Sequence, residues 1–303
     1  MSSDPLADLA RSLTDFAQAF RDVLTRNPQP APGSPAEKEG EGEQFAGDWG
    51  EHPSRDIFAA TYLQVTSCTD HLLALAPVLT SRRSVFAPYT LARGALEAAA
   101  GACYLTDNGI DARERLRRNM NSRLVGFCEQ IWMLNTSTFT SDDAARKIAY
   151  NEKRIGQFER TATRHGFRFE KAKRIGVSAY LDKPTPPIMD LVGLAVDNQA
   201  PELGKTYYRL LSAAAHSEIH GLARLLVPVG STPGRPGEAL AAVNLDAESL
   251  ARELVAGPLA AHSMAKGVEW FTGCDLSDLH GPANQMLCTW ARVGKLQLPE
   301  VTP

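Results

Sequence analysis

The chain has 303 residues and a formal net charge of −3, with 44% hydrophobic and 22% charged residues. These values are ordinary for a globular protein with a sizeable core, and the negative net charge argues against a dedicated nucleic-acid binder. No run of eighteen apolar residues occurs, and the opening MSSDPLADLA lacks the basic and apolar regions of a secretory signal. We therefore expect a cytoplasmic protein with no membrane span.

The five cysteines are odd in number and scattered, and none forms a C-x-x-C pair. Disulfide frameworks use even numbers of cysteines, and structural zinc sites use closely spaced ones, so the pattern predicts reduced thiols. The chain also has no P-loop, no G-x-G-x-x-G turn and no G-x-S-x-G elbow, and we expect no cofactor.

The first 54 residues divide into a helix and a linker. Apolar residues recur at three- and four-residue spacing through residues 5–26, which predicts an amphipathic helix over 1–26. Residues 27–54 are rich in proline, glycine and glutamate, and residues 37–51 hold six acids and one lysine. Such a composition buries little, so it predicts a disordered acidic linker that tethers the first helix. The tethered helix is then free to dock on the body, on a partner subunit or nowhere.

Residues 55–303 are predicted to form one helical-bundle domain. Helical periodicity, capping residues and breaks place its helices at about 56–80, 83–106, 111–136, 141–166, 186–199, 203–227, 246–271 and 281–292. Strand signals are confined to 167–181, which reads as an irregular excursion or a short hairpin, and residues 228–238 form a long polar loop. The fold class is therefore all-α, a multi-helix bundle with a tethered N-terminal helix.

An arginine lies on the apolar face of the helix predicted at 83–106. Arg93 falls in the middle of the stripe formed by Phe86, Tyr89, Leu96, Ala100 and Cys103. A buried guanidinium needs an acceptor, and Glu97 lies one turn further on, within reach of an ion pair. The pair is either structural, closing the contact between two packed helices, or the floor of a polar pocket that binds a ligand.

The helix predicted at 203–227 carries four polar side chains in one line: Arg209, Ser212, His216 and His220. At 100° per residue this line lies beside the expected core face, formed by Tyr208, Leu211, Ala215, Ile219, Leu222 and Leu226. Side chains that border a core face line the grooves between helices. We therefore interpret these four residues as one wall of a groove, in which Gly221 admits a close neighbour.

One interpretation of this wall is a metal site. His216 and His220 are four residues apart, a spacing that suits two imidazole ligands on one helix. The sequence contains neither H-E-x-x-H nor repeated E-x-x-H, and a third ligand would have to come from His71 or His262.

A second interpretation is acid–base chemistry on a phosphodiester, because a histidine can move a proton and an arginine can hold a phosphate. The stretch from Arg209 to His216 resembles the R-x(4–6)-H motif of the HEPN superfamily. The stretch LARGALEAAAGACYL, with Arg93 and Glu97, is similar to an R-x-x-x-E helix of HEPN-like bacterial proteins.

The resemblance covers about residues 60–227 and rests on few polar residues. It implies an all-helical fold and a metal-independent endoribonuclease that works as a dimer, with Arg209 and His216 as catalytic residues. Other members have lost activity and bind nucleotides or partners. This chain departs from the pattern in that Leu210 follows the arginine, where a polar residue is usual, and the spacing of six is at the long end of the range.

The charge is unevenly distributed. Residues 146–174 hold ten lysines and arginines against three acids, and residues 113–123 hold five arginines against one acid. A basic stretch attracts phosphates, whereas the simpler reading is a solvated helix face. RNA or a nucleotide is thus a predicted partner, and the N-terminal helix makes a homodimer plausible.

Three hypotheses follow. The first is a HEPN-like ribonuclease that uses His216 as acid or base and Arg209 on phosphate. The second is a non-catalytic helical module whose groove, with Arg93, Glu97, Ser212 and His220, binds a nucleotide, a small ligand or a partner. The third is a metal-dependent enzyme built on His216 and His220.

Overall fold

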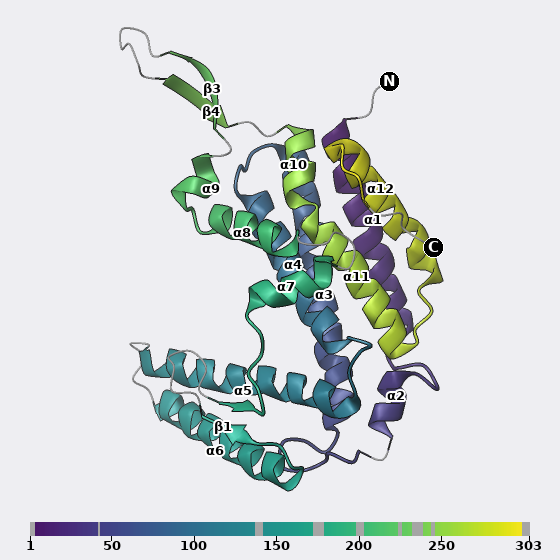
Figure 1. Cartoon of the computed structure of the whole chain (residues 1–303), viewed down its shortest axis with the longest axis vertical. Helices are drawn as coiled ribbons and strands as arrows, with labels where there is room; N and C mark the ends of the chain where they lie inside the picture. Colours follow the sequence, from purple (N-terminus) through teal and green to yellow (C-terminus); the bar gives the residue numbers. More distant parts are fainter. Residues whose placement is uncertain are drawn as a thin grey trace.

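The computed structural model describes residues 4–41, 43–136, 142–171, 179–197, 203–223, 226–231, 239–243 and 246–298, without the side chains of 197, 220, 222, 227–231 and 239–243. Helices make up most of the described chain, which confirms the predicted all-α fold (Figure 1). None of the described helices combines the length and apolarity that crossing a bilayer requires.

The helices are α1 (Pro5–Arg26), α2 (Pro35–Gly40), α3 (Pro53–Ser81), α4 (Ala87–Leu105), α5 (Ala112–Thr136), α6 (Asp142–Arg164), α7 (Ile188–Asp197), α8 (Gly204–Ala215), α9 (Ile219–Ala223), α10 (Ala247–Leu254), α11 (Ala256–Thr272) and α12 (Ser277–Gly294). The strands are β1 (Phe169–Glu170), β2 (Tyr180–Leu181), β3 (Leu226–Ser231) and β4 (Ala239–Val243). Each helix predicted in the body has a counterpart among these elements, with two of the predicted helices divided in two.

Helix α4 is the centre of the bundle and packs against α3, α7, α8 and α11. It is surrounded on most sides because alanines occupy much of its length: Ala92, Ala95, Ala98, Ala99, Ala100 and Ala102 are all buried. Small side chains let neighbouring helix axes approach closely, so the helix that carries Arg93 and Glu97 is held rigidly by its neighbours.

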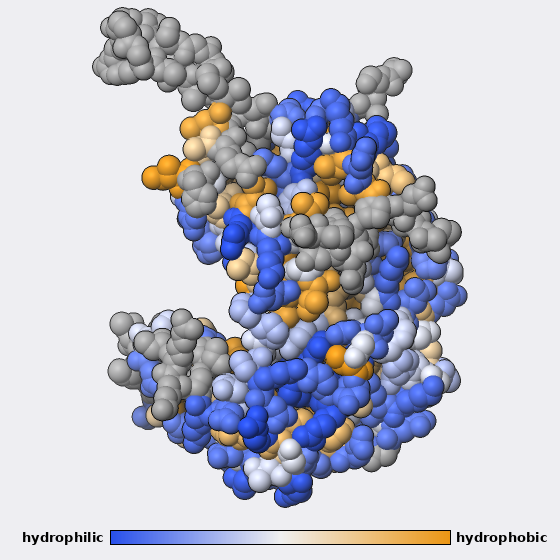
Figure 2. Space-filling model, viewed as in Figure 1, coloured by the Kyte–Doolittle hydropathy of each residue, from blue (hydrophilic) through white to orange (hydrophobic). Residues whose placement is uncertain are grey.

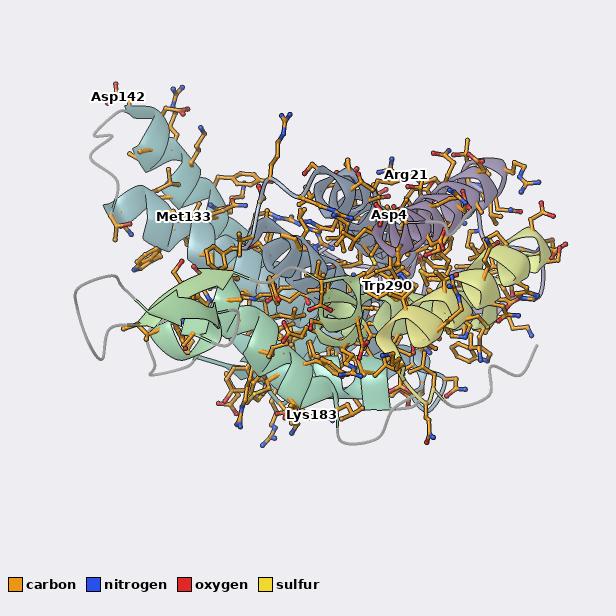
Figure 3. The ribbon with its side chains drawn as sticks, turned by 90° about the horizontal axis from the view of Figure 1, so that it is seen from above. Asp4, Arg21, Met133, Asp142, Lys183 and Trp290 are labelled. Atoms are coloured by element: carbon orange, nitrogen blue, oxygen red, sulfur yellow. The ribbon has the colours of Figure 1, made fainter. Side chains whose placement is uncertain are left out.

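Helix α1 belongs to the bundle, so of the three places open to the tethered N-terminal helix (the body, a partner subunit or none) the structure shows the body. Asp4 caps its first turn by accepting a hydrogen bond from the Leu6 backbone, and a proline at the first helical position fits the helix start. Its apolar stripe is fully buried against α3 and α12: Leu9, Leu13, Phe16, Ala17 and Phe20 are all at 0% exposure. In Figure 3, α1, which follows the labelled Asp4 and carries Arg21, lies beside α12 with Trp290.

The segment between α1 and α3 is ordered where the structure describes it, contrary to the predicted disordered linker. It forms the short helix α2, capped by Ser34, and it buries Trp49 completely. The Trp49 ring stacks on His165 with 5.7 Å between ring centroids and meets Phe158 and Phe167 edge-on. One large aromatic side chain thus anchors a segment whose average composition is polar.

Helices α5 and α6 pack on each other and form a second apolar core around Trp49 and Phe158. This pair projects from the bundle, and Figure 3 places Met133 and Asp142 at its far end. The space-filling view shows a hollow between the α5–α6 pair and the part that carries α7 and α8 (Figure 2).

Two small antiparallel hairpins complete the described chain. Strands β1 and β2 pair through Phe169–Leu181 and Glu170–Tyr180, which confirms the short hairpin within 167–181. The pair of β3 and β4 was not expected, because residues 228–238 were predicted to be a polar loop. Residues 232–238 lie outside the described chain. Strands β3 and β4 pack mainly on each other and project from the bundle (Figure 1).

Candidate functional site

The polar centre of the bundle lies where α4 meets α8. Helix α4 contributes Arg93 and Glu97, α8 contributes Tyr208, and His216 follows the last residue of α8. The Arg93 side chain is 20% exposed and that of Glu97 is 35% exposed, whereas His216 is an exposed residue. The centre therefore reaches from the buried side of α4 to the surface.

Arg93 uses all three of its nitrogens. Its Nε donates to Glu97 Oε1 at 2.7 Å, its Nη1 meets His216 Nε2 at 2.8 Å, and its Nη2 donates to the Tyr208 hydroxyl at 3.3 Å. The Tyr208 hydroxyl also donates to Glu97 Oε1, at 3.1 Å. The predicted Arg93–Glu97 pair is thus present, and it holds together two elements more than a hundred residues apart in the chain.

The charges in the centre stabilise one another. Burial alone would lower the pKa of Arg93, but the hydrogen bond and the charge of Glu97 outweigh it and raise the pKa above its usual value. Burial, together with the Glu97 charge, raises the pKa of Tyr208. At neutral pH the centre therefore holds a charged guanidinium beside a protonated phenol.

The Arg93 guanidinium fixes the hydrogen-bonding role of His216. A guanidinium has five N–H donors and accepts nothing, so His216 Nε2 must accept the hydrogen bond and the ring proton sits on Nδ1. Three donors of Arg93 are occupied by Glu97, Tyr208 and His216, which leaves one N–H on each terminal nitrogen. No described residue accepts from these two donors.

His216 reaches Arg93 because α8 ends earlier than its sequence predicts. The Ser217 N–H donates to Ala214 O and the Glu218 N–H to Ala213 O, which together form a Schellman cap. Ser217 takes the left-handed conformation, with φ of 56°. Glycine usually occupies this position, and its absence is why the sequence predicted an uninterrupted helix over 203–227.

The chain then folds back as α9. A Cβ at Gly221 would lie 2.7 Å from the carbonyl carbon of Ala213, so only glycine permits this close return. The expected core face is correct for Tyr208 and Leu211, which are buried, and wrong for Ile219 and Leu226, which are 84% and 49% exposed. Both of these errors lie beyond the cap.

The predicted line of four polar residues is broken by this cap. Arg209 is exposed, and no described residue forms an ion pair or a hydrogen bond with its guanidinium. The structure brings Arg93 to His216 in place of the predicted Arg209. Ser212 is half-buried, and its carbonyl oxygen accepts from the His216 backbone. The His220 side chain lies outside the described chain.

The metal interpretation loses its geometric basis. His216 ends α8 and His220 lies in α9, so the two histidines do not have the spacing of one regular helix. His216 Nε2 faces a cationic guanidinium, and His71 lies against Gly94 in the contact of α3 with α4. Within the described residues no group of three or more histidine, cysteine, aspartate or glutamate side chains is placed to hold a metal ion.

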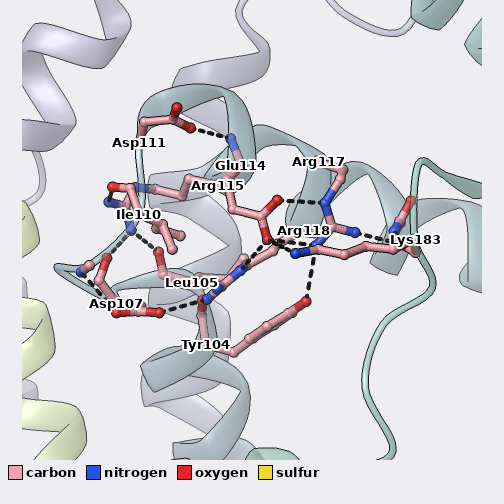
Figure 4. Close-up of polar contacts among 12 residues, drawn as sticks. Tyr104, Leu105, Asp107, Ile110, Asp111, Glu114, Arg115, Arg117, Arg118 and Lys183 are labelled. Atoms are coloured by element: carbon pink, nitrogen blue, oxygen red, sulfur yellow. Dashed lines mark hydrogen bonds and ion pairs between the residues drawn. The ribbon is translucent and has the colours of Figure 1, made fainter. Parts of the chain in front are cut away.

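The arginines of residues 113–123 do not form the basic surface that their charge predicts. Arg115 is at 0% exposure in the first turns of α5 (Figure 4). It forms an ion pair with Glu39 of α2 at 3.1 Å and donates to three carbonyl oxygens, those of Leu105, Asp107 and Ile110. It therefore joins α2 and the end of α4 to the start of α5.

Arg117 and Arg118 share the carboxylate of Glu114, which accepts from them at 2.7 and 3.1 Å. Arg118 also pairs with Asp107 and lies 4.1 Å from the ring centroid of Tyr104. Burial would raise the pKa of Glu114, but these hydrogen bonds outweigh it and lower the pKa to about 2. All three arginines hold the fold and offer no surface to phosphate.

Helix α6 keeps the exposed part of the basic charge. The side chains of Arg146, Lys147 and Arg160 are 78%, 61% and 63% exposed. Arg146 and Lys147 pair with Asp143, and such surface pairs are weak and screened by salt. The described part of the stretch 146–174 therefore remains available to a polyanion.

Sequence reasoning placed Tyr208 in the core and did not assign it to the site. Its ring is buried as expected, but its hydroxyl bridges Arg93 and Glu97. The sequence does contain an indication of this role, because a buried tyrosine hydroxyl needs a polar partner and Arg93 needs acceptors.

Comparison with protein-family models, with curated proteins and with solved structures finds no match. Function therefore has to be inferred from the geometry of the centre itself.

Proposed function

We propose that the centre formed by Arg93, Glu97, Tyr208 and His216 is the active site of a metal-independent endoribonuclease. The observation that carries this proposal is the 2.8 Å contact between Arg93 Nη1 and His216 Nε2. It places an exposed imidazole and a guanidinium with two free donors at one point. A proton acceptor beside a phosphate-binding cation is the arrangement that cleavage of a phosphodiester requires.

Arg93 and His216 have complementary roles in the proposed reaction. An RNA phosphate that takes the free donors of Arg93 competes with His216 for the guanidinium, and the Nε2 lone pair is released. His216 then removes the proton of the ribose 2′-hydroxyl, whose oxygen forms a bond to phosphorus. The bond from phosphorus to the 5′ oxygen breaks, that oxygen takes a proton from water, and the hydroxide that is left takes the proton held by His216. The products are a 2′,3′-cyclic phosphate and a 5′-hydroxyl.

Glu97 and Tyr208 position the guanidinium in this scheme. Glu97 binds its Nε and Tyr208 binds its Nη2, and one N–H on each terminal nitrogen stays free for a phosphate. The exposed basic residues of α6 supply a surface that attracts the RNA backbone. The resemblance to the HEPN superfamily remains a prediction, and the catalytic arginine proposed here is Arg93, where that resemblance implied Arg209.

A second candidate function is binding without catalysis. It is favoured by the fact that the His216 lone pair is occupied by Arg93 in this structure. If a bound phosphate does not displace that contact, the centre holds a nucleotide or another anion and leaves it unchanged.

Cleavage of an RNA oligonucleotide by EDTA-treated protein tests the proposal. We expect wild-type protein to cleave and His216→Ala to be about 10²–10⁴-fold slower, the usual contribution of a general base. Arg93→Lys keeps the positive charge and loses the planar guanidinium with its paired N–H donors, so this variant should also cleave RNA slowly. Arg82→Ala removes an exposed arginine that pairs with Asp4, and it serves as the matched control.

Each alternative has its own result. A 2′-deoxy substitution at the cleaved position should block the reaction, because the attacking hydroxyl is missing. Loss of activity in Arg209→Ala with normal activity in Arg93→Lys would restore the arginine assigned from the sequence. RNA binding by wild type with no cleavage would replace the nuclease by the binding function, and activity that depends on added metal would contradict both.

A further inference from the structure

The outward side of α3 carries apolar side chains where a surface helix usually has polar ones. Ile57, Val65 and Leu72 face the core, whereas Phe58, Ala59, Tyr62 and Leu63 lie on the other side. Leu63 is 69% exposed, and the rings of Phe58 and Tyr62 lie 6.2 Å apart in a tilted arrangement. This stripe needs a covering that the fold supplies only in part.

The segment that follows α1 forms the facing wall. Residues 28–41 run along the stripe, and the two walls line an open pocket of about 850 Å³. Pro28 and Pro30 contribute their rings, and α2 contributes Ala36 and Gly40. A volume of this size is in the range that small organic molecules occupy, and rings on both walls suit a flat or bulky apolar ligand.

The charged groups around the pocket favour a cation. Glu37 and Glu41 line it against a single arginine, Arg55, so two negative charges face one positive charge. Glu37 is held in place by the Gly33 N–H, at 2.5 Å. Phe58 and Tyr62 also line the pocket, and aromatic rings attract a positive group. An anion of the same shape would meet repulsion from both carboxylates.

We propose that this pocket binds a lipophilic organic cation, with the apolar body between Tyr62 and the proline rings and the charge towards Glu37 and Glu41. It shares no residue with the Arg93 centre, so it stands whether or not the protein cleaves RNA. It gives the ordered segment 27–41 a binding role in addition to its place in the fold.

Two probes of the same shape and opposite charge test the proposal. Tetraphenylphosphonium and tetraphenylborate are measured separately against full-length protein by isothermal titration calorimetry. We expect the cation to bind at least tenfold more tightly than the anion. Glu41→Gln should reduce this preference, and Leu63→Arg should weaken cation binding at least tenfold by placing a positive charge in the pocket. Leu63 is exposed, so this change leaves the core intact.

Leu194→Arg is the matched control, since Leu194 is a 53% exposed leucine on α7 and does not line the pocket. It should bind the cation as wild type does. Equal or tighter binding of tetraphenylborate, no binding of either probe, or equal loss in the Leu63→Arg and Leu194→Arg proteins would each overturn the proposal.

Discussion

Two arginine centres lie along α4, one near its middle and one at its C-terminal end, and they differ in what their guanidinium groups bind. At the end of α4, Arg115 is fully buried and binds backbone carbonyl oxygens and one carboxylate. Nearer the start of α4, Arg93 is one-fifth exposed and binds only side chains, one of them the exposed His216. Carbonyl oxygens are fixed by the backbone, whereas the His216 ring can move away.

The comparison shows how a structural arginine differs from a functional one. A guanidinium bound by the backbone cannot exchange its partners without unfolding, so Arg115 can only stabilise the fold. A guanidinium with two free donors and a displaceable imidazole can bind a ligand at little cost. Charge along the sequence does not distinguish the two, because the arginine-rich stretch holds the fold and a lone arginine forms the site.

The largest expected effect is on stability at Arg115. Arg115→Met leaves the carboxylate of Glu39 and three carbonyl oxygens without their donor in a buried place, and removing one partner of a buried ion pair costs about 3–5 kcal/mol. Arg93→Met should lower the free energy of unfolding by only about 1–2 kcal/mol, because that centre is closer to water. Urea denaturation measures both values, and equal losses would contradict the comparison.

The buried histidine of α11 should dominate acid sensitivity at mildly acidic pH. Burial, with smaller effects of Lys266 and His280, lowers the pKa of His262 to about 4. Neither ring nitrogen has a hydrogen-bond partner within the described chain. Between pH 6.5 and 4 the unfolded chain binds a proton that the folded one does not, so stability should fall by up to about 3 kcal/mol as the pH falls.

The His262→Leu variant isolates this contribution. It should be nearly as stable at pH 4.5 as at pH 7 when unfolding is followed by urea denaturation. An unchanged pH dependence in the variant would show that another group is responsible.

A smaller acid effect should come from the Arg115 end of α4. The pKa of Glu114 is lowered to about 2 in the folded protein, so its contribution is complete above pH 4.5 and is lost as the pH falls towards 2. Because the carboxylate is partly exposed and screened by solvent, we expect a loss of about 1–2 kcal/mol. Urea denaturation of the His262→Leu protein between pH 5 and 2.5, with and without Glu114→Gln, measures it. A slope that persists with Glu114→Gln would contradict this assignment.

The smallest effect should be at the cap that positions His216. Ser217 holds a positive φ that serine rarely adopts, so Ser217→Gly should raise the free energy of unfolding by up to about 1 kcal/mol. RNA cleavage should be retained, because the cap geometry is unchanged. Destabilisation by Ser217→Gly in urea denaturation would mean that the serine side chain, and not the backbone, matters at this position.

The helices of the body could be predicted because their periodicity and breaks are local properties of the sequence. The place where α1 docks was left open by the sequence, because it depends on α3 and α12, which no local pattern encodes. The ordering of residues 27–41 and 43–54 was missed for a similar reason. A single tryptophan, Trp49, finds its partners more than a hundred residues away in the chain.

Arg93 and His216 were each singled out from the sequence, but their contact was not predicted. Arg93 required an acceptor and His216 lay at the edge of a core face, but nothing in the sequence places the two side by side. That contact depends on the cap at Ser217, where the usual glycine is missing. Arg209 was preferred because it lies on the same helix as His216, which is a weaker guide than a contact across the fold.

The most direct measurement is the ¹⁵N spectrum of the His216 ring, recorded with and without a non-cleavable 2′-deoxy oligonucleotide. In free wild-type protein we expect the proton on Nδ1 and an accepting Nε2, and we expect the Nε2 signal to move when the oligonucleotide binds. Arg93→Met should abolish the response. A His216 ring with its proton on Nε2 would contradict the Arg93–His216 centre as a phosphate site. An Nε2 signal of the wild-type protein that does not move when the oligonucleotide is added would contradict it as well.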